Sequence, residues 1–376
     1  MPLTDLTLFY RSDILKSDTM NLTNEGIMMN RQKTAITYTL LHFFVDFTTI
    51  FLIARVIIGP KTTLANRGYV IIVYNLLAFA GQLPMGMISD IIRKNRIVAA
   101  LGCAFAAISY PLSFVTPYLA CVFAALGNGA FHIGAGSEIL QMSMPKAGLS
   151  GLFVSGGALG VWLAYKIQIP GIIFICPVIT GLCAILLFMY GRKQRADITE
   201  TKIHYGKPSL TVLMAVICFM LTIVIRSLLG TVMDFSWKSV PAFSLAFVLA
   251  VAFGKAMGGF LADKFGKTKT AAVSLSISLF AFVFAFRIPF AGIIAVLCFN
   301  MTMPLTLTAI AGVCKNKNGF AFGLTTFALA MGFVPVVFST GDLFGLPMLT
   351  ISVTASLILL VTGLSLLKNV TEEDGI

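Results

Sequence analysis

The sequence predicts an all-α membrane protein in which twelve transmembrane helices form two pseudo-symmetric six-helix bundles. Three observations predict this fold: an apolar composition, twelve apolar runs long enough to span a bilayer, and a basic turn motif that occurs once in each half of the chain.

The composition excludes an ordinary soluble domain. Apolar residues make up 58% of the 376 residues and charged residues only 11%, with a mean hydropathy of +0.93. A net charge of +12 would suit a nucleic-acid-binding protein only if Lys and Arg gathered on a polar scaffold. Here they fall between apolar runs, so no nucleic-acid partner is expected. The seven cysteines lie in or beside apolar runs without metal-ligand spacing, so we expect no metal, cofactor or disulfide framework.

Each apolar run is close to the roughly 20 residues that a membrane-spanning helix needs. The chain begins with a polar segment, residues 1–32, which lacks a signal peptide and is expected to be a cytoplasmic tail. A second start at Met28 leaves open that residues 1–27 are a mis-called extension. The runs cover residues 34–58, 68–89, 97–115, 117–139, 148–166, 169–190, 209–232, 240–262, 270–288, 290–313, 319–339 and 346–367.

One polar stretch, residues 191–208, divides the runs into six and six. It predicts an N-terminal bundle at 33–190, a C-terminal bundle at 209–368 and a short tail at 369–376. Nineteen of the 27 Lys and Arg residues fall on the side of the central loop and both termini. By the positive-inside rule that side is cytoplasmic, in a plasma (inner) membrane.

The repeated turn joins the second run to the third and the eighth run to the ninth. Its Gly, Asp and Lys recur at a constant offset, as Gly86, Asp90 and Lys94 and again as Gly259, Asp263 and Lys267. Both aspartates fall at helix C-terminal ends, where the dipole disfavours a carboxylate, so each needs basic neighbours or the N-terminus of another helix. The glycines permit close helix approach. A simpler alternative is that the basic residues act only as a topology signal.

The stretch Gly259-x-Leu261-Ala262-Asp263-Lys264-x-Gly266-Lys267-x-Lys269 resembles the loop signature of the major facilitator superfamily. The first copy departs from that pattern at Ile91 and Arg93, which replace a basic residue and a glycine. The resemblance covers almost all of residues 33–368, and it implies secondary transport by alternating access around a central cavity. The expected conformational latch comprises Gly86, Asp90, Arg93, Lys94, Gly259, Asp263, Lys264, Gly266 and Lys267.

Polar residues inside the runs need a partner, a cavity or a function, because an unpaired charge at mid-membrane costs about 2.5–3.5 kcal/mol. His42 and Asp46 are four residues apart on one helical face and form the candidate proton-coupling pair, with a structural hydrogen bond as the alternative. Arg226 requires an anion, either a substrate or Asp46. The candidate cavity residues are Gln82, Asn128, His132, Thr222, Arg226, Asn300 and Thr302. Lys255 is expected either to snorkel to the surface or to face the cavity.

Two short stretches, His42-Phe43-Phe44-Val45-Asp46 and Phe131-His132, are similar to those of fosmidomycin-resistance-type exporters. This resemblance, together with the glycine-rich run around Gly156, implies a proton-coupled antiporter for efflux of a drug-like or anionic compound. Uptake or facilitated diffusion of a small solute is the alternative. A membrane enzyme or receptor is the rival from another class, but the loops are too short and too poor in catalytic residues to favour it. No catalytic residue is expected, and the protein is expected to act as a monomer.

Overall fold

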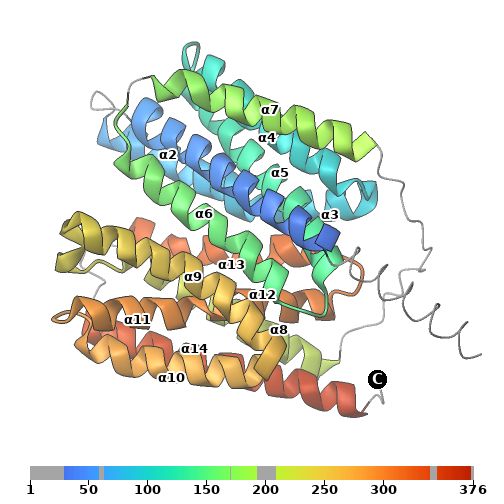
Figure 1. Ribbon diagram of the computed structural model, residues 1–376, viewed down its shortest axis with the longest axis vertical. Helices are drawn as coiled ribbons and strands as arrows, with labels where there is room; N and C mark the ends of the chain where they lie inside the picture. The colour runs from blue at the N-terminus through green and yellow to red at the C-terminus, as the bar shows by residue number, and fades with distance from the viewer. Residues whose placement is uncertain (1–28, 59–62, 170, 193–208, 339–344, 374–376) are drawn as a thin grey trace, which may run out of the picture.

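The computed structural model describes residues 29–58, 63–169, 171–192, 209–338 and 345–373. Within them, twelve helices are long and apolar enough to cross a membrane, which confirms the predicted fold class, and no strand occurs among these residues (Figure 1). Most of the expected N-terminal tail and central loop, and the last three residues, lie outside these ranges.

Six spans come from the first half of the chain. The first helix, Met29–Ile57, ends in the π-helical turn η1 (Leu52–Ile57). A second π-helical turn lies inside the second span, Asn66–Ile92. The remaining elements of this half are α2 (Leu64–Asn75), η2 (Leu76–Ala80), α3 (Gln82–Ile92), α4 (Asn95–Ser113), α5 (Pro117–Ser143), α6 (Gly148–Lys166) and α7 (Ile172–Arg192).

The second half supplies the other six spans. One of them, Pro289–Val313, is interrupted at Met301, three residues before the first-turn proline Pro304 of its second part. The elements are α8 (Leu210–Val232), η3 (Ser236–Ser239), α9 (Pro241–Phe265), α10 (Lys267–Phe284), α11 (Pro289–Asn300), α12 (Thr302–Val313), α13 (Asn318–Phe338) and α14 (Leu346–Glu373).

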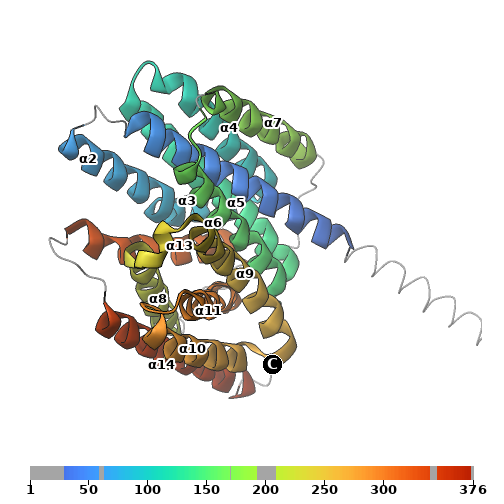
Figure 2. The ribbon, with the colours of Figure 1, turned by 60° about the vertical axis from the view of Figure 1, so that its left-hand side comes forward.

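Helices of each half pack mainly on one another and form two groups (Figures 1 and 2). The groups meet chiefly through two helix pairs, α6 with α9 and α3 with α13. In the first pair the fifth span of the first half packs on the second span of the other half. In the second pair the second span of the first half packs on the fifth span of the other, so the two pairs are related by a two-fold pseudo-symmetry.

The aspartates of the repeated turn bridge these two pairs. Asp263, near the end of α9, accepts hydrogen bonds from the backbone N–H groups of Ala147 (2.6 Å) and Gly148 (2.9 Å), where α6 begins. Asp90, near the end of α3, accepts from the N–H groups of Gly319 and Phe320 (both 2.8 Å) in the first turn of α13. Each carboxylate therefore lies on the positive end of a helix dipole from the opposite bundle.

Glycines permit this close approach. A Cβ on Gly86 would collide with the carbonyl of Gly319, and one on Gly259 would collide with the carbonyl of Ala147. The two copies differ at the next position of the motif. Arg93 adopts the left-handed α conformation (φ 53°, ψ 28°), whereas the equivalent Gly266 has φ 89° and ψ 148°. The left-handed α conformation costs a non-glycine residue about 1–2 kcal/mol, so the first copy of the turn is more strained than the second.

We call each Asp with its two amides a latch, and the end of the molecule where both latches lie the basic end. Lys94 is exposed there as the N-terminal cap of α4, and Lys267 opens α10 beside Asp263. Lys264 lies over the ring of Phe265, with its Nζ 5.2 Å from the ring centroid, which is within the roughly 6 Å reach of a cation–π contact. The latches hold the two bundles together at the basic end.

Asp90→Asn and Asp263→Asn should each favour separation of the bundles at the basic end, because each removes a charge–dipole interaction worth about 1–2 kcal/mol. We expect a roughly five- to thirtyfold shift in the population of the separated state. Spin labels at Lys146→Cys and Lys315→Cys in a Cys314→Ser background would report it as a longer distance. Asp234→Asn, which changes an exposed carboxylate elsewhere, is the control; distance distributions equal to wild type in both latch variants would contradict the latch.

Candidate functional site

His42 and Asp46 of the first helix and His132 of α5 form a compact cluster at the interior of the first bundle. The Nε2 atom of His42 lies 3.2 Å from Asp46 Oδ2, and His132 Nε2 lies 3.6 Å from Asp46 Oδ1. The two Nε2 atoms are 2.8 Å apart. The side chains of His42, Asp46 and His132 are only 7, 13 and 12% exposed, so this triad is shielded from bulk water.

The hydrogen-bond network assigns the tautomers of both histidines. His42 Nδ1 lies 2.8 Å from the carbonyl oxygen of Phe153, and His132 Nδ1 lies 2.8 Å from the carbonyl oxygen of Asn128. A carbonyl only accepts, so each Nδ1 carries a hydrogen. In the neutral rings both Nε2 atoms are then lone-pair acceptors that face one another beside a carboxylate. A cation between the two Nε2 atoms would complete this arrangement.

A second set of side chains orients the carboxylate. Asn128 donates from Nδ2 to Asp46 Oδ1 (2.8 Å) and to Thr49 Oγ1 (3.1 Å). Tyr74 donates to the same Thr49 hydroxyl (3.1 Å), which links the second span to the cluster. Asn128 was expected in the cavity itself, whereas the structure places it behind Asp46 as a positioning residue.

The triad also has the composition of a metal site. His42, Asp46 and His132 each offer a ligand atom, and these atoms lie within 4.8 Å of one another. Histidines whose Nδ1–H groups donate to carbonyls are typical of metal ligands. The expectation of no metal came from cysteine spacing, which could not detect residues 90 positions apart. Two cations in the same cavity, Arg226 and Lys255, oppose a divalent ion more strongly than a single proton.

The triad lies in the wall of a cavity of about 480 Å³ between the two bundles. The lining reaches the last turn of α8 at Gly230, then Met233, and the first turn of α9 at Ser244. Those residues belong to the end opposite the latches. The cavity therefore extends from the triad away from the basic end.

Arg226 and Lys255 line this cavity from the second bundle. Arg226 is 8% exposed and donates from Nη1 to Thr306 Oγ1 (3.2 Å). The expected pairing with Asp46 is absent, because that carboxylate is already held by the two histidines and Asn128. Lys255 faces the cavity and does not snorkel to the surface.

The remaining expected cavity residues divide into two groups. Gln82 and Asn300 line the cavity, and the Oε1 atom of Gln82 is buried without a hydrogen-bond partner. Thr222 and Thr302 do not line it; both are buried and donate to carbonyls of their own chain, at Cys218 (2.8 Å) and Phe299 (2.9 Å). Sequence periodicity missed this outcome because buried threonines commonly bond the preceding turn.

Glu138 of α5 forms a separate structural cluster. It pairs with Arg96 (Nε to Oε1, 2.6 Å) and accepts from the Tyr38 hydroxyl (2.9 Å). Tyr38 lies on the same face of the first helix as His42, about two helical turns from Asp46, and is not part of the triad. Through Glu138 and Arg96 it connects the first helix to α5 and α4.

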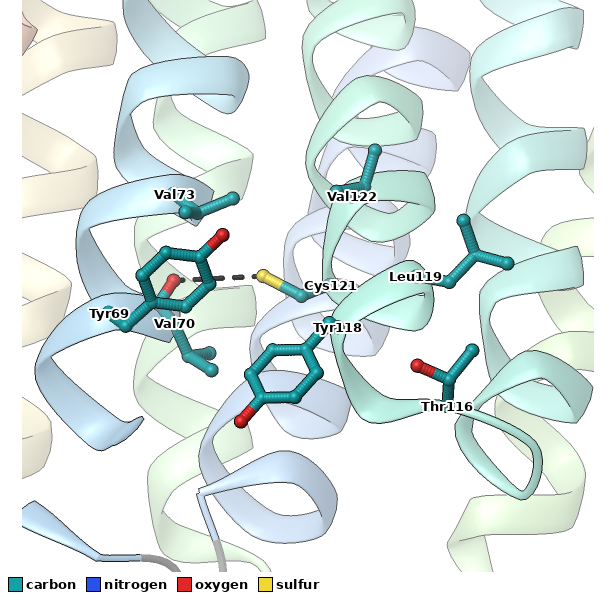
Figure 3. A pocket seen from close by; sticks show the side chains of 8 residues that line it. All are labelled: Tyr69, Val70, Val73, Thr116, Tyr118, Leu119, Cys121 and Val122. Carbon is teal, nitrogen blue, oxygen red and sulfur yellow. Dashed lines mark hydrogen bonds between the residues drawn. The ribbon is translucent and has the colours of Figure 1, made fainter. Parts of the chain in front are cut away.

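A second, apolar hollow of about 300 Å³ lies between α2 and α5 (Figure 3). Tyr69 and Tyr118 meet there edge to face, with ring centroids 5.8 Å apart, and the Cys121 thiol donates to the carbonyl of Val70 (3.6 Å). No charged side chain lines it. Exposed tyrosines near helix ends are typical of the membrane interface, so this hollow is a packing feature of the lipid-facing surface.

Gly157 of α6 permits the triad to form. A Cβ there would collide with Asp46 Oδ2 and His42 Nε2. Gly157→Ala should therefore displace the triad and lower the free energy of unfolding by about 1–3 kcal/mol, the usual cost of overpacking. Thermal unfolding of the purified protein measures this change.

Gly181→Ala is the matched control, because its Cβ would meet only the Cβ of Ala107 at 4.0 Å. Equal unfolding temperatures for the two variants would show that α6 does not constrain the triad.

The fold resembles several solved transporters. FucP in its outward conformation aligns with a TM-score of 0.65 at 10% identity, over 89% of this chain and 98% of that one. A bacterial homologue of the iron transporter ferroportin, in its outward-facing state, gives 0.59 at 14% identity, over 90 and 98%. The human organic anion transporter MFSD10 gives 0.62 at 13% identity, over 88 and 99%. These likenesses show the fold alone.

Among curated proteins, a sequence search finds no match. The family model of the Major Facilitator Superfamily, however, matches residues 34–336, which is most of the chain and includes both latches, the triad and both cavity cations. Twelve spans, two six-helix groups and a repeated turn that joins them agree with that match. The chain belongs to the Major Facilitator Superfamily.

Proposed function

We propose that this membrane protein is a proton-coupled secondary transporter of a small amphiphilic or anionic compound, acting as a monomer in the plasma membrane with both termini cytoplasmic. The observation that carries the proposal is the pair of histidine Nε2 atoms, 2.8 Å apart and beside Asp46, in the wall of the cavity between the bundles.

A proton is the simplest cation that satisfies this arrangement. Placed between the two Nε2 atoms, it turns two opposed lone pairs into one hydrogen bond and gives the ionised Asp46 a cationic partner. Loss of that proton leaves the two lone pairs opposed again, so the site has a loaded and an empty state. Asn128 keeps Asp46 oriented in both states through its Nδ2 hydrogen bond.

Alternating access follows from the two latches. With the basic end on the cytoplasmic side, as the positive-inside rule predicts, the latched state opens its cavity outward. The opposite state requires release of the four amide hydrogen bonds to Asp90 and Asp263. Loading the triad changes the charge between the bundles, and that change can bias the equilibrium between the two states.

The direction of transport has two candidates. The resemblance of His42-Phe43-Phe44-Val45-Asp46 to exporters favours proton antiport and efflux. Uptake with a proton is the alternative, and one structural neighbour, the E. coli fucose:proton symporter FucP, works in that mode. Purified protein that moves solute across liposomes distinguishes either mode from a membrane enzyme or receptor.

Asp46→Asn should abolish proton-driven accumulation, because a neutral amide cannot stabilise the proton shared by His42 and His132. Folding and membrane insertion should persist, since Asn retains the acceptor for Asn128. The measurement is uptake or extrusion by proteoliposomes with and without a pH gradient, for a substrate identified in a compound screen.

In the same assay Asp234→Asn should behave as wild type, because Asp234 is 84% exposed and far from the triad in sequence. Wild-type accumulation by Asp46→Asn would exclude the triad as the coupling site, and transport indifferent to pH in the wild type would favour a passive facilitator.

A further inference from the structure

Arg226 and Lys255 are the two cavity-lining cations of the second bundle that lack a carboxylate partner among the described residues. The only hydrogen bond of the Arg226 guanidinium in this part of the chain is to the Thr306 hydroxyl, which leaves four of its five donors without a protein acceptor. The Lys255 ammonium has no protein acceptor there. Lys238 differs, since it pairs with Asp234 (3.4 Å) and donates to the Met233 carbonyl (2.8 Å).

Two unpaired cations facing one cavity between the bundles are costly. Charges removed from water lose solvation, and these two also repel one another. Arg226 cannot shed its proton to escape this cost. Such an arrangement persists where a mobile anion supplies the missing negative charge. Asp46 cannot supply it, because its two oxygens are held by His42, His132 and Asn128.

We propose that the substrate is an organic anion whose acid group is bound jointly by Arg226 and Lys255. The inference deepens, and rests on, the proposed role of this protein as a transporter. The planar guanidinium offers paired donors that suit the oxygens of a carboxylate, sulfonate or phosphonate. Lys255 adds a compact second charge from the neighbouring helix α9.

The rest of the cavity selects for an apolar body on that anion. Aromatic and aliphatic side chains dominate its lining, among them Phe79, Trp162, Phe247 and Phe299. Its volume of about 480 Å³ accommodates a molecule of one to three rings together with water. A free inorganic ion would leave this apolar surface unused, so the favoured substrate is amphiphilic.

Proton binding at the triad strengthens anion binding. The charged and titratable groups that face the triad or the anion site are His42, Asp46, Tyr74, His132, Arg226 and Lys255. One proton added between His42 and His132 makes this set more positive by one charge, which strengthens its attraction for an anion. By thermodynamic reciprocity the anion then favours the proton to the same extent.

Mutual strengthening is the property of a symporter, in which both ligands travel together. An antiporter needs the two ligands to exclude one another. The charges in this cavity therefore favour cotransport of an organic anion with a proton over proton-driven efflux.

The test is equilibrium binding to the purified full-length protein, with 2-naphthoate and 2-naphthalenesulfonate as probes and the neutral 2-naphthamide as their isostere. Thermal unfolding can be followed with a thiol-reactive dye, because six of the seven cysteines are buried in the folded protein. We expect both anions to bind at least tenfold more tightly than the amide. Affinity for the anions should rise as the pH falls through the range in which the triad takes up its proton.

Arg226→Gln and Lys255→Gln should each reduce anion affinity at least tenfold and leave amide binding unchanged. Arg226→Lys, which keeps the charge, should retain the preference for anions even if Arg226→Gln fails to fold. Lys166→Gln, at an exposed cation in the last turn of α6, is the control. His132→Gln should remove the pH dependence of anion binding while keeping the preference for anions.

Three results would overturn the inference: no stabilisation by either anion at 10 mM or above, equal affinity for anion and amide, or undiminished anion binding in both Arg226→Gln and Lys255→Gln. Anion binding that weakens as the pH falls would refute cotransport. Because these assays use no gradient, they are independent of proteoliposome transport. If the anions fail to bind while proton-driven transport still depends on Asp46, only the substrate class is rejected. If the anions bind as expected but transport does not depend on Asp46 or on a proton gradient, proton coupling is rejected and the anion site remains.

Discussion

The arrangement of charge around Asp46 is the constraint on which the rest of the structure depends. A carboxylate in the interior of a membrane protein must be compensated, and here two imidazoles and one carboxamide approach it from two helices. Both imidazoles are held by carbonyl oxygens on their far sides. Helix α6 packs against this group through Gly157, because any side chain there would overlap Asp46 Oδ2 and His42 Nε2.

At the basic end of the molecule, too, each carboxylate is stabilised by groups from another helix, but there the donors are backbone N–H groups. Asp90 and Asp263 are satisfied by backbone amides and helix dipoles from the opposite bundle. Such contacts need close and specific helix geometry, which makes them either fully formed or lost. They are therefore suited to hold one of two discrete states. In the mechanism that we propose, the triad and the cavity cations determine which ligands favour each state.

Much of the fold could be predicted from the sequence, because a helix that spans a membrane must be apolar and about 20 residues long. Length and apolarity therefore locate the spans to within a few residues. The i, i+4 spacing of His42 and Asp46 was equally readable, being local. His132 could be placed on a cavity-facing helix but not joined to Asp46, since that contact spans 86 residues of chain. For Asp90 and Asp263 the sequence left two kinds of partner open, basic neighbours or the N-terminus of another helix, and it could not identify that helix. The position of Lys255 along its span could not decide whether its side chain snorkels to the surface or faces the cavity. The sequence also suggested an ion pair of Arg226 with Asp46, which the structure does not form. The hydroxyl of Thr222 bonds the preceding turn of α8, and that of Thr302 bonds the last turn of α11; periodicity does not encode either choice.

The central claim is that His42 and His132 share one proton, and ¹⁵N NMR of the histidine side chains tests it most directly. The chain contains only three histidines, so His42, His132 and His204 can be assigned by single substitutions to Gln. The account predicts that Nδ1 of His42 and His132 stays protonated throughout, while their Nε2 signals titrate together as one coupled unit that Asp46→Asn disrupts. Independent titration of the two rings, indifferent to Asp46→Asn, would contradict it.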